Sequence, residues 1–315
     1  MKEYLLQKRD NLIIEKICNN ARLSYNQIAK ATKISKDSVR DRIKKMEKEL
    51  FILSYFPLIN YPKIGLQLFH AYIRLSSSAK ANKNLLHNLG KINNIVSITW
   101  ILGKYDLELQ IISKNRKDAV KEIKNTISNI KELDILKSEE LKFYSMGIET
   151  EKKSYNILEN KKKIEIDSID LKLISLLAKN ARARIIDLSE ELNLEEHQIR
   201  YRIKRLLSEK VILDFYTRTN KHRRGLNSYI MLLKINNKLP KEKIDEMQKI
   251  RNIYYFKNCK GKYQAIIRFY SENTKALIST ILEIRTILEK ETINFEIFPL
   301  LERHKFLPFS LPEKN

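Results

Sequence analysis

Two short segments of this 315-residue chain carry side chains suited to contact with a nucleic acid. Each segment mixes arginine with other polar residues that face away from an apolar stripe. Arginine and glutamine can pair with two atoms of a guanine or adenine edge, whereas lysine mostly holds phosphates. The residues assigned to DNA contact are Lys36, Ser38, Arg40, Arg42 and Lys45 in the first segment, and His197, Gln198, Arg200, Tyr201, Arg202 and Arg205 in the second.

Each segment is predicted to be the last of three short helices. Ser35 stands where an N-cap belongs in the first copy, and Glu195, a weaker cap, stands at the matching place in the second. Three short helices with a tight connection between the second and third are typical of a helix-turn-helix, whose last helix can lie in the major groove. The buried stripes are Val39, Ile43 and Met46 in one copy and Ile199, Ile203 and Leu206 in the other.

The chain contains the same domain pair twice. Residues 10–55 align without a gap on residues 170–215, 160 positions later, so that Asn20-Ala21-Arg22 falls on Asn180-Ala181-Arg182. Further on, Gly103-Lys104-Tyr105 falls on Gly261-Lys262-Tyr263. Because a repeated glycine usually marks a backbone geometry that other residues do not tolerate, the repeat predicts shared structure and an internal pseudo-twofold axis.

After each helical segment the pattern changes to alternating or continuous apolar runs, which predict two βαββαβ modules. The expected fold class is α+β, with two winged or helix-turn-helix domains alternating with two ferredoxin-like domains in an intramolecular pseudo-dimer. The polar connector is expected to let the second helical module reposition. The predicted domains are 1–55 (helical), 60–144 (ferredoxin-like), 145–166 (linker), 167–215 (helical), 225–303 (ferredoxin-like) and 304–315 (tail).

Composition narrows the partners. A formal net charge of +23 and a pI of about 9.7 favour a polyanion, although an AT-rich genome would also enrich lysine. The two cysteines, Cys18 and Cys259, are expected to be reduced thiols. Without an apolar run of membrane-spanning length or a signal-peptide core, we expect a cytoplasmic protein with no membrane partner. Nothing in the pattern calls for a metal, a cofactor or a catalytic residue.

The combined order resembles the Lrp/AsnC family over nearly the whole chain. The resemblance depends on the helix-turn-helix that opens with Asp and Asn-Ala-Arg, and on Gly-Lys-Tyr-Asp between the second and third strands of the βαββαβ module. It implies a transcription regulator that binds double-stranded DNA. It also implies that the βαββαβ domains pair sheet to sheet into a dimer, here within one polypeptide, with further assembly of chains left open.

The resemblance also implies an effector site, because the Gly-Lys-Tyr-Asp loop of that family lies where amino acids or related metabolites bind. The corresponding residues are Gly103, Tyr105, Asp106, Gly261 and Tyr263. Asp106 could meet an amine, and the second copy has Gln264 instead, so the first half is the expected effector site. The glycines could equally serve tight turns without a ligand. The family usually has glycine near the end of the third helix, where this chain has Leu50 and Lys210.

Two other functions remain open. An architectural protein that coats DNA with little sequence preference would suit the charge. Decarboxylases acting on siroheme-type tetrapyrroles are similar in architecture, and His222 in the basic segment 221–227 could serve as a general acid. Because the other histidines are scattered and a basic loop beside DNA-binding helices is the simpler interpretation, we expect a protein that is not an enzyme.

Overall fold

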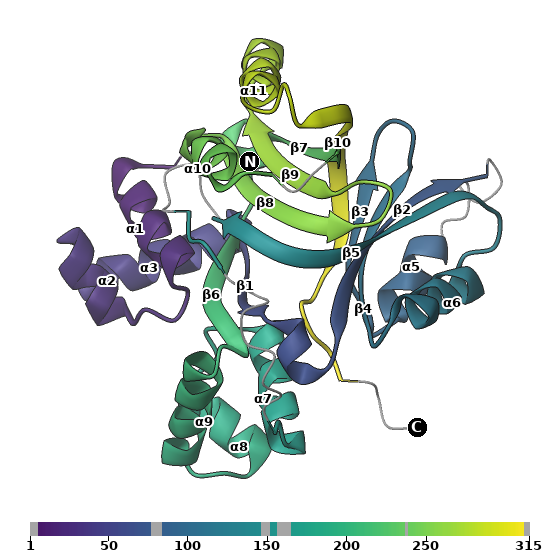
Figure 1. Ribbon diagram of the computed structural model, residues 1–315. Coiled ribbons are helices and arrows are strands. Elements are labelled where there is room, and N and C mark those ends of the chain that lie inside the picture. Colours follow the sequence, from purple (N-terminus) through teal and green to yellow (C-terminus); the bar gives the residue numbers. More distant parts are fainter. Residues whose placement is uncertain (1–5, 77–83, 146–151, 156–164, 237–238, 312–315) are drawn as a thin grey trace. The chain divides into compact units, whose positions relative to one another are not determined.

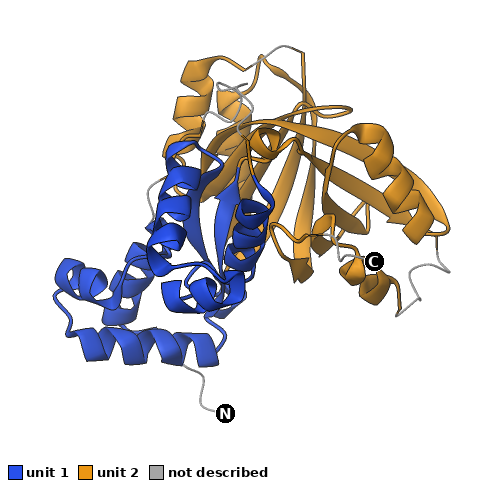
Figure 2. Cartoon of the chain, turned by 90° about the horizontal axis from the view of Figure 1, so that it is seen from below, with its two compact units in different colours: residues 1–59, 145–151, 167–225 blue, residues 60–144, 152–166, 226–315 orange. Residues whose placement is uncertain are grey.

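The computed structural model describes residues 6–76, 84–145, 152–155, 165–236 and 239–311. It divides into two compact units, drawn in blue and orange in Figure 2. The helical unit contains residues 1–59, 145–151 and 167–225, and the barrel unit contains residues 60–144, 152–166 and 226–315. Within the described ranges, no helix combines the length and apolar composition needed to cross a bilayer.

The helical unit contains the two predicted three-helix modules, each followed by one strand (Figure 1). Their elements are α1 (Lys8–Asn19), α2 (Tyr25–Thr32), α3 (Lys36–Lys48) and β1 (Ile52–Ile59), then α7 (Ser168–Lys179), α8 (Ile185–Leu192), α9 (Glu196–Ser208), β6 (Ile212–Thr219) and η2 (His222–Arg224). Ser35 caps α3 as predicted, its hydroxyl accepting a hydrogen bond from Ser38 N. Glu195 caps α9 through a reciprocal pair with Gln198.

Helices α3 and α9 both end beside a residue in the left-handed region. Leu50 has φ of 55° and Lys210 has φ of 57°, at the two places where glycine was noted as missing. A side chain costs free energy in this conformation, and glycine relieves it. Since the Leu50 side chain is 55% exposed, its removal gives up little packing.

We therefore expect Leu50→Gly and Lys210→Gly each to raise the free energy of unfolding by about 0.5–1 kcal/mol. Urea unfolding followed by circular dichroism would measure the change. Glu49 precedes Leu50 with φ of −84°, so Glu49→Gly is a matched control that should destabilise instead. Equal destabilisation by all three glycines would contradict the explanation.

The barrel unit contains the two predicted βαββαβ halves. The first comprises β2 (Gln67–Leu75), α5 (Asn84–Lys91), β3 (Ile95–Ile101), β4 (Leu107–Ser113), α6 (Arg116–Thr126) and β5 (Ile130–Tyr144), after η1 (Tyr61–Ile64). The second comprises β7 (Asn227–Ile235), α10 (Lys241–Lys249), β8 (Ile253–Lys260), β9 (Ala265–Ser271), α11 (Thr274–Ile287) and β10 (Thr292–Phe306).

The two halves share one closed barrel in the order β10-β3-β4-β2-β5-β8-β9-β7. Strand β5 pairs with β2 of its own half through Lys137 and then with β8 of the other half. Strand β10 makes the corresponding passage from β7 to β3. The predicted sheet-to-sheet dimer thus occurs within one polypeptide, closed at two seams.

Each half buries an apolar core between strands and helices on the outer side of the barrel, and Phe143 of β5 joins the core of the second half (Figure 1). In β2, Phe69, Ala71 and Ile73 belong to the core under α5 and α6. Because side chains alternate along a strand, His70 and Tyr72 face the barrel interior, where the two halves meet.

The predicted start of the C-terminal tail differs from the structure. The tail was expected to begin at residue 304, but β10 continues to Phe306 and Phe309 is buried. The strand is longer because its last residues pair with β3 of the other half, which the local pattern cannot reveal.

The connector is predicted to let the second helical module reposition, and one part of it has fixed contacts: Lys152 Nζ donates a 2.6 Å hydrogen bond to the carbonyl oxygen of Gln248 in α10. Gln248 Nε2 donates in return to Lys152 O at 2.9 Å, so this part of the connector is held against the barrel. The lysines at 161–163 lie outside the described residues. The predicted thiols Cys18 and Cys259 are both buried and unbridged.

Candidate nucleic-acid interface and ligand pocket

Helix α3 exposes part of its predicted reading face. Lys36 and Lys45 are exposed, and Ser38 and Arg40 are half-buried. The Arg40 guanidinium forms ion pairs with Asp37 at 3.0 Å and Asp41 at 3.1 Å. The exposed charge of this arginine is thus partly neutralised by its own helix.

Helix α9 presents a different face. His197, Gln198, Arg200 and Tyr201 are all exposed, and the Tyr201 side chain is 64% exposed. Arg200 pairs with Glu196 at 2.7 Å, one turn earlier. The places that Asp37 and Asp41 occupy in α3 are taken by His197 and Tyr201 in α9. The two faces therefore differ in charge and in shape.

Three predicted DNA contacts have another role in the structure. Arg42 donates to the carboxylate of Asp10 at 2.8 Å, and Arg202 donates to that of Asp170 at 2.7 Å. Arg205 also pairs with Asp170.

Both aspartates are fully buried at the first turns of α1 and α7. In the structure, Arg42, Arg202 and Arg205 therefore tie the third helix of each module to the first.

The repeated Asn-Ala-Arg motif joins the two modules. Arg22 Nη1 donates to the carbonyl oxygen of Ala181 at 2.6 Å, and Arg182 Nη1 donates to that of Ala21. The backbone N–H of Ala21 bonds to Phe215 O, while that of Ala181 bonds to Tyr55 O. Strands β1 and β6 pair antiparallel beside these contacts. The motif is therefore a reciprocal clamp that holds α3 and α9 in one unit, a role that its spacing did not indicate.

The two Gly-Lys-Tyr turns meet each other across the barrel seam. Tyr105 Oη donates to Asp134 of β5, and Tyr263 Oη donates to Glu296 of β10 at 2.5 Å. Lys262 pairs with Asp134 at 2.7 Å, which links the second turn to the first half. Burial and the Glu296 carboxylate raise the pKa of Tyr263 to about 12.

Asp106 closes a turn. Its Oδ2 accepts a 2.8 Å hydrogen bond from Leu75 N, and Gln264 Oε1 accepts the matching bond from Ile235 N at 3.0 Å. The aspartate and the glutamine accept equivalent backbone hydrogen bonds in the two halves, so their difference in charge does not by itself mark the first half as the effector site.

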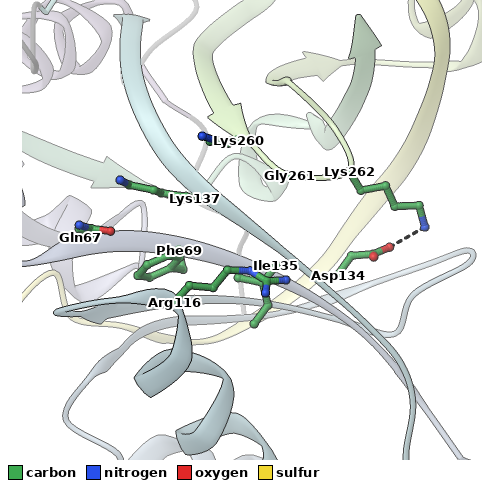
Figure 3. Close-up of a pocket in the computed structure, with 9 residues that line it drawn as sticks. All are labelled: Gln67, Phe69, Arg116, Asp134, Ile135, Lys137, Lys260, Gly261 and Lys262. Atoms are coloured by element: carbon green, nitrogen blue, oxygen red, sulfur yellow. Dashed lines mark hydrogen bonds and ion pairs between the residues drawn. The ribbon is translucent and has the colours of Figure 1, made fainter.

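A pocket of about 470 Å³ opens beside the second turn instead (Figure 3). Its lining comprises Gln67, Phe69, Arg116, Asp134, Ile135, Lys137, Lys260, Gly261 and Lys262. Four of these side chains are cationic, and the single carboxylate, Asp134, is already bonded to Lys262 and Tyr105. Of the five predicted effector residues, only Gly261 lines the pocket, although Tyr105 supports its wall through Asp134.

The repeat does not reproduce this pocket chemistry. Thr274 occupies the place of Arg116 one position after an N-cap asparagine, and Leu102 occupies that of Lys260 before the turn glycine. Pro299 occupies the place of the third cation, Lys137. The two are equivalent because they follow Leu136 and Phe298, the residues that a Cβ added at Gly261 and at Gly103 would meet. Only one of the two equivalent places therefore carries the cluster of cations.

Inside the barrel, Glu108 of β4 lies between His70 Nδ1 at 3.1 Å and the guanidinium of Arg268 from the other half. Burial lowers the pKa of His70 to about 4, which keeps the imidazole neutral near pH 7. Despite burial, Arg268 and His70 lower the pKa of Glu108 to about 2. An ionised carboxylate and a guanidinium therefore share the interior.

Lys257 lies in the same interior. Burial, and then the charge of Arg268, lower its pKa from 10.5 to about 7, with Glu108 opposing the change. Between pH 7 and 10.5 Lys257 is protonated in more of the unfolded chains than of the folded ones, so its contribution to stability rises with pH.

We expect Lys257 to contribute up to about 1.4 kcal/mol per pH unit between pH 7 and 9 in chemical unfolding, while Lys221 and Lys152, whose pKa values burial lowers to about 8, add to the slope above pH 8 in the wild type and the variant alike. Lys257→Thr, which copies Thr99 of the first half, should flatten the curve. Burial raises the pKa of the Cys259 and Cys18 thiols from 9.0 to about 12 and about 11, so above pH 9 they oppose this rise in stability, and the slope is read below pH 9. An unchanged slope in the variant would contradict the assignment.

Comparisons with known proteins identify the helical modules. A model of winged helix-turn-helix DNA-binding domains matches residues 6–49, and a model of AsnC-type helix-turn-helix domains matches residues 166–207. An uncharacterized HTH-type transcriptional regulator of Pyrococcus abyssi is 27% identical over 124 residues, 39% of this chain and 84% of its own length.

The HTH-type transcriptional regulator LysM of Sulfurisphaera tokodaii is 28% identical over 127 residues, 39% of this chain and 87% of its own length. Such relatives correspond in length to one of the two repeats. The crystal structure of the siroheme decarboxylase NirDL superposes with a TM-score of 0.62 over 96% of this chain and 94% of that one, at 9% identity. This last similarity concerns the fold alone.

Proposed function

We propose that this chain, whose two helical modules match helix-turn-helix DNA-binding models and which carries its Lrp/AsnC-like unit twice, is a sequence-specific DNA-binding transcription regulator whose two reading helices recognise unlike half-sites. The observation that carries the proposal is the clamped pair of helices α3 and α9, which expose different polar faces. In a symmetric arrangement, two such helices enter successive major-groove faces about 34–36 Å apart, or a multiple of that distance.

The DNA-contacting residues proposed are the predicted ones that are not paired with Asp10 or Asp170. In α9 these are His197, Gln198, Arg200 and Tyr201, of which Gln198 also takes part in the cap. In α3 they are Lys36, Ser38, Arg40 and Lys45, with Lys36 and Lys45 proposed to hold phosphates.

Selection of bound fragments from random DNA at ~0.15 M salt tests the proposal, because purely electrostatic binding is already weak there. We expect a two-part motif with unequal halves. Arg200→Ala should relax the preference in one half by about 1–3 kcal/mol. Arg40→Ala is the matched variant and should change less, since two carboxylates, Asp37 and Asp41, engage Arg40, whereas Glu196 alone is paired with Arg200.

Retention of DNA without an enriched motif would instead favour an architectural role. An enriched motif that Arg200→Ala leaves unchanged in both halves would remove α9 from the reading surface.

We also propose that the pocket beside Gly261 binds an anionic effector, with a carboxylate or phosphate group held by Arg116, Lys137 and Lys260. Its volume lies in the range of small-molecule sites, and its cations lack enough carboxylates to neutralise them. An amino acid would bring its carboxylate to these cations.

Calorimetric titration with glutamate, succinate and inorganic phosphate would test the pocket. We expect saturable binding of at least one of these probes, weakened at least tenfold by Arg116→Ala or Lys260→Ala. Thr274→Ala, at the place equivalent to Arg116, is the matched control and should bind as the wild type does. Equal weakening by all three variants would contradict the location.

The enzyme alternative rests on the similarity of fold to NirDL. His222, the histidine offered as a general acid, is exposed in η2 of the helical unit. We infer that the chain is not a decarboxylase, and that siroheme added to the protein will keep its free absorption spectrum and all its carboxylates. A bound spectrum with loss of carbon dioxide, abolished in His222→Ala, would overturn this inference.

A further inference from the structure

The interior of the barrel is the surface through which the two halves recognise each other. Within each half, strand pairing places corresponding residues opposite one another. Tyr72 faces Glu108 in the first half, and Leu232 faces Ile266 in the second. In the next pair, His70 faces Gln110, whereas Ile230 faces Arg268. The two interior surfaces are therefore matched in geometry but not in chemistry.

The differences have a consistent direction. Along the neighbouring strands, Thr99 pairs with Glu108 in the first half, and Lys257 pairs with Ile266 in the second. The first half thus contributes the carboxylate, and the second contributes both cations. Neither half has the complementary charge at the equivalent place.

The charges are deeply buried, so their pairing matters. The Glu108 side chain is 1% exposed and that of Arg268 is 5% exposed, and the two are bonded across the halves. A buried charge that loses its partner is strongly destabilising, whereas a paired one is tolerated. Two first halves brought together would bury two carboxylates without a cation, and two second halves would bury two guanidiniums and two lysine side chains without a carboxylate.

We infer that the barrel interior is a recognition surface that accepts only an unlike half, so that each first half pairs with a second half and rejects a like half of another copy of this chain. A homodimeric interface must place the same residue on both sides of its twofold axis. This interior departs from that condition at each of the five pairs of equivalent positions compared, and it favours one pairing by penalising the others. One α3 and one α9 therefore accompany every barrel.

Two full-length variants test the inference. In the acid chain, Ile266→Glu, Arg268→Gln and Lys257→Thr give the second half the residues that the first half has at Glu108, Gln110 and Thr99. In the base chain, Glu108→Ile, Gln110→Arg and Thr99→Lys make the converse change. Each chain alone then has two like halves. We expect each to lose at least 100-fold in its folding equilibrium constant, measured by urea unfolding.

Co-expression of the acid and base chains separates selective pairing from a simple loss of stability, because only selective pairing restores a folded protein. With different affinity tags, the acid and base chains should copurify as a folded one-to-one pair, since every barrel then contains unlike halves. Neither chain should copurify with a differently tagged copy of itself.

A third variant with all six substitutions in one chain controls for damage by the substitutions themselves. It moves the ion pair to the equivalent place on the other side of the pseudo-twofold axis. This chain should fold as a monomer within tenfold of the wild-type equilibrium constant. The inference is overturned if the acid and base chains alone unfold at the wild-type urea concentration, if they fail to copurify, or if the six-substitution chain is as unstable as either.

Discussion

Replacement of Asp170 by alanine is expected to lower the free energy of unfolding by about 3 kcal/mol. The Asp170 carboxylate is fully buried and bonds to Arg202 and Arg205 of α9. It also accepts the backbone N–H of Asp167 at 3.3 Å, at the N-cap of α7. One substitution therefore removes the cap partner and leaves two guanidiniums without their buried partner. The change would be measured by denaturant unfolding.

Loss of this contact should also reduce binding to one half-site only, because α9 would no longer be held against α7. Asp170→Asn keeps the size of the side chain and tests the charge alone, so we expect a smaller loss of stability. Asp10→Ala makes the same change at Arg42 in the first module and should affect the other half-site. A loss below about 1 kcal/mol for Asp170→Ala would show that the ion pairs of Asp170 are not needed to position α9.

Replacement of Gly261 by alanine should be comparably severe, at about 3 kcal/mol. The residue has φ of 154°, and an added Cβ would lie 2.8 Å from Leu136 Cδ2 and 2.9 Å from Ile135 O. A backbone oxygen in a strand cannot move aside cheaply. The turn of the second half would be pushed away from β5 of the first half, opening the barrel at this seam.

Two other glycines separate the possible causes of that loss. Gly225 has φ of 68° with nothing within 4 Å of an added Cβ, so Gly225→Ala should cost only about 1 kcal/mol for its backbone conformation. At Gly103, the nearest atom would be Phe298 Cδ1 at 3.1 Å, in a ring that can shift, so an intermediate loss is expected. Equal losses for all three, measured by thermal unfolding, would mean that close contact at the seam is unimportant.

Local patterns were enough to predict the elements. The buried stripe of α3, the cap at Ser35 and the alternation along β2 all depend on neighbours within a few residues. The repeat predicted the internal pseudo-dimer, because two like units must hide two like apolar surfaces. The order of strands within each half followed from the same pattern.

Contacts between distant residues were beyond the sequence patterns. Arg42 lies beside the stripe residue Ile43, and spacing alone cannot decide whether a long side chain turns outward to DNA or back to Asp10. The pairing of β1 with β6 and the bond from Arg22 to Ala181 join residues about 160 positions apart. The basic pocket was missed for the same reason, since its cations come from α6, β5, the end of β8 and the turn after it.

The unlike faces of α3 and α9 have one more consequence. A regulator with two identical reading helices can be turned end for end on its operator without any change in its contacts. Here the clamp through Arg22 and Arg182 joins one helix that carries Asp37 and Asp41 to another that carries His197 and Tyr201. On the unlike half-sites proposed above, this protein would therefore bind in only one of the two orientations along the DNA, which gives the bound complex a direction relative to the promoter.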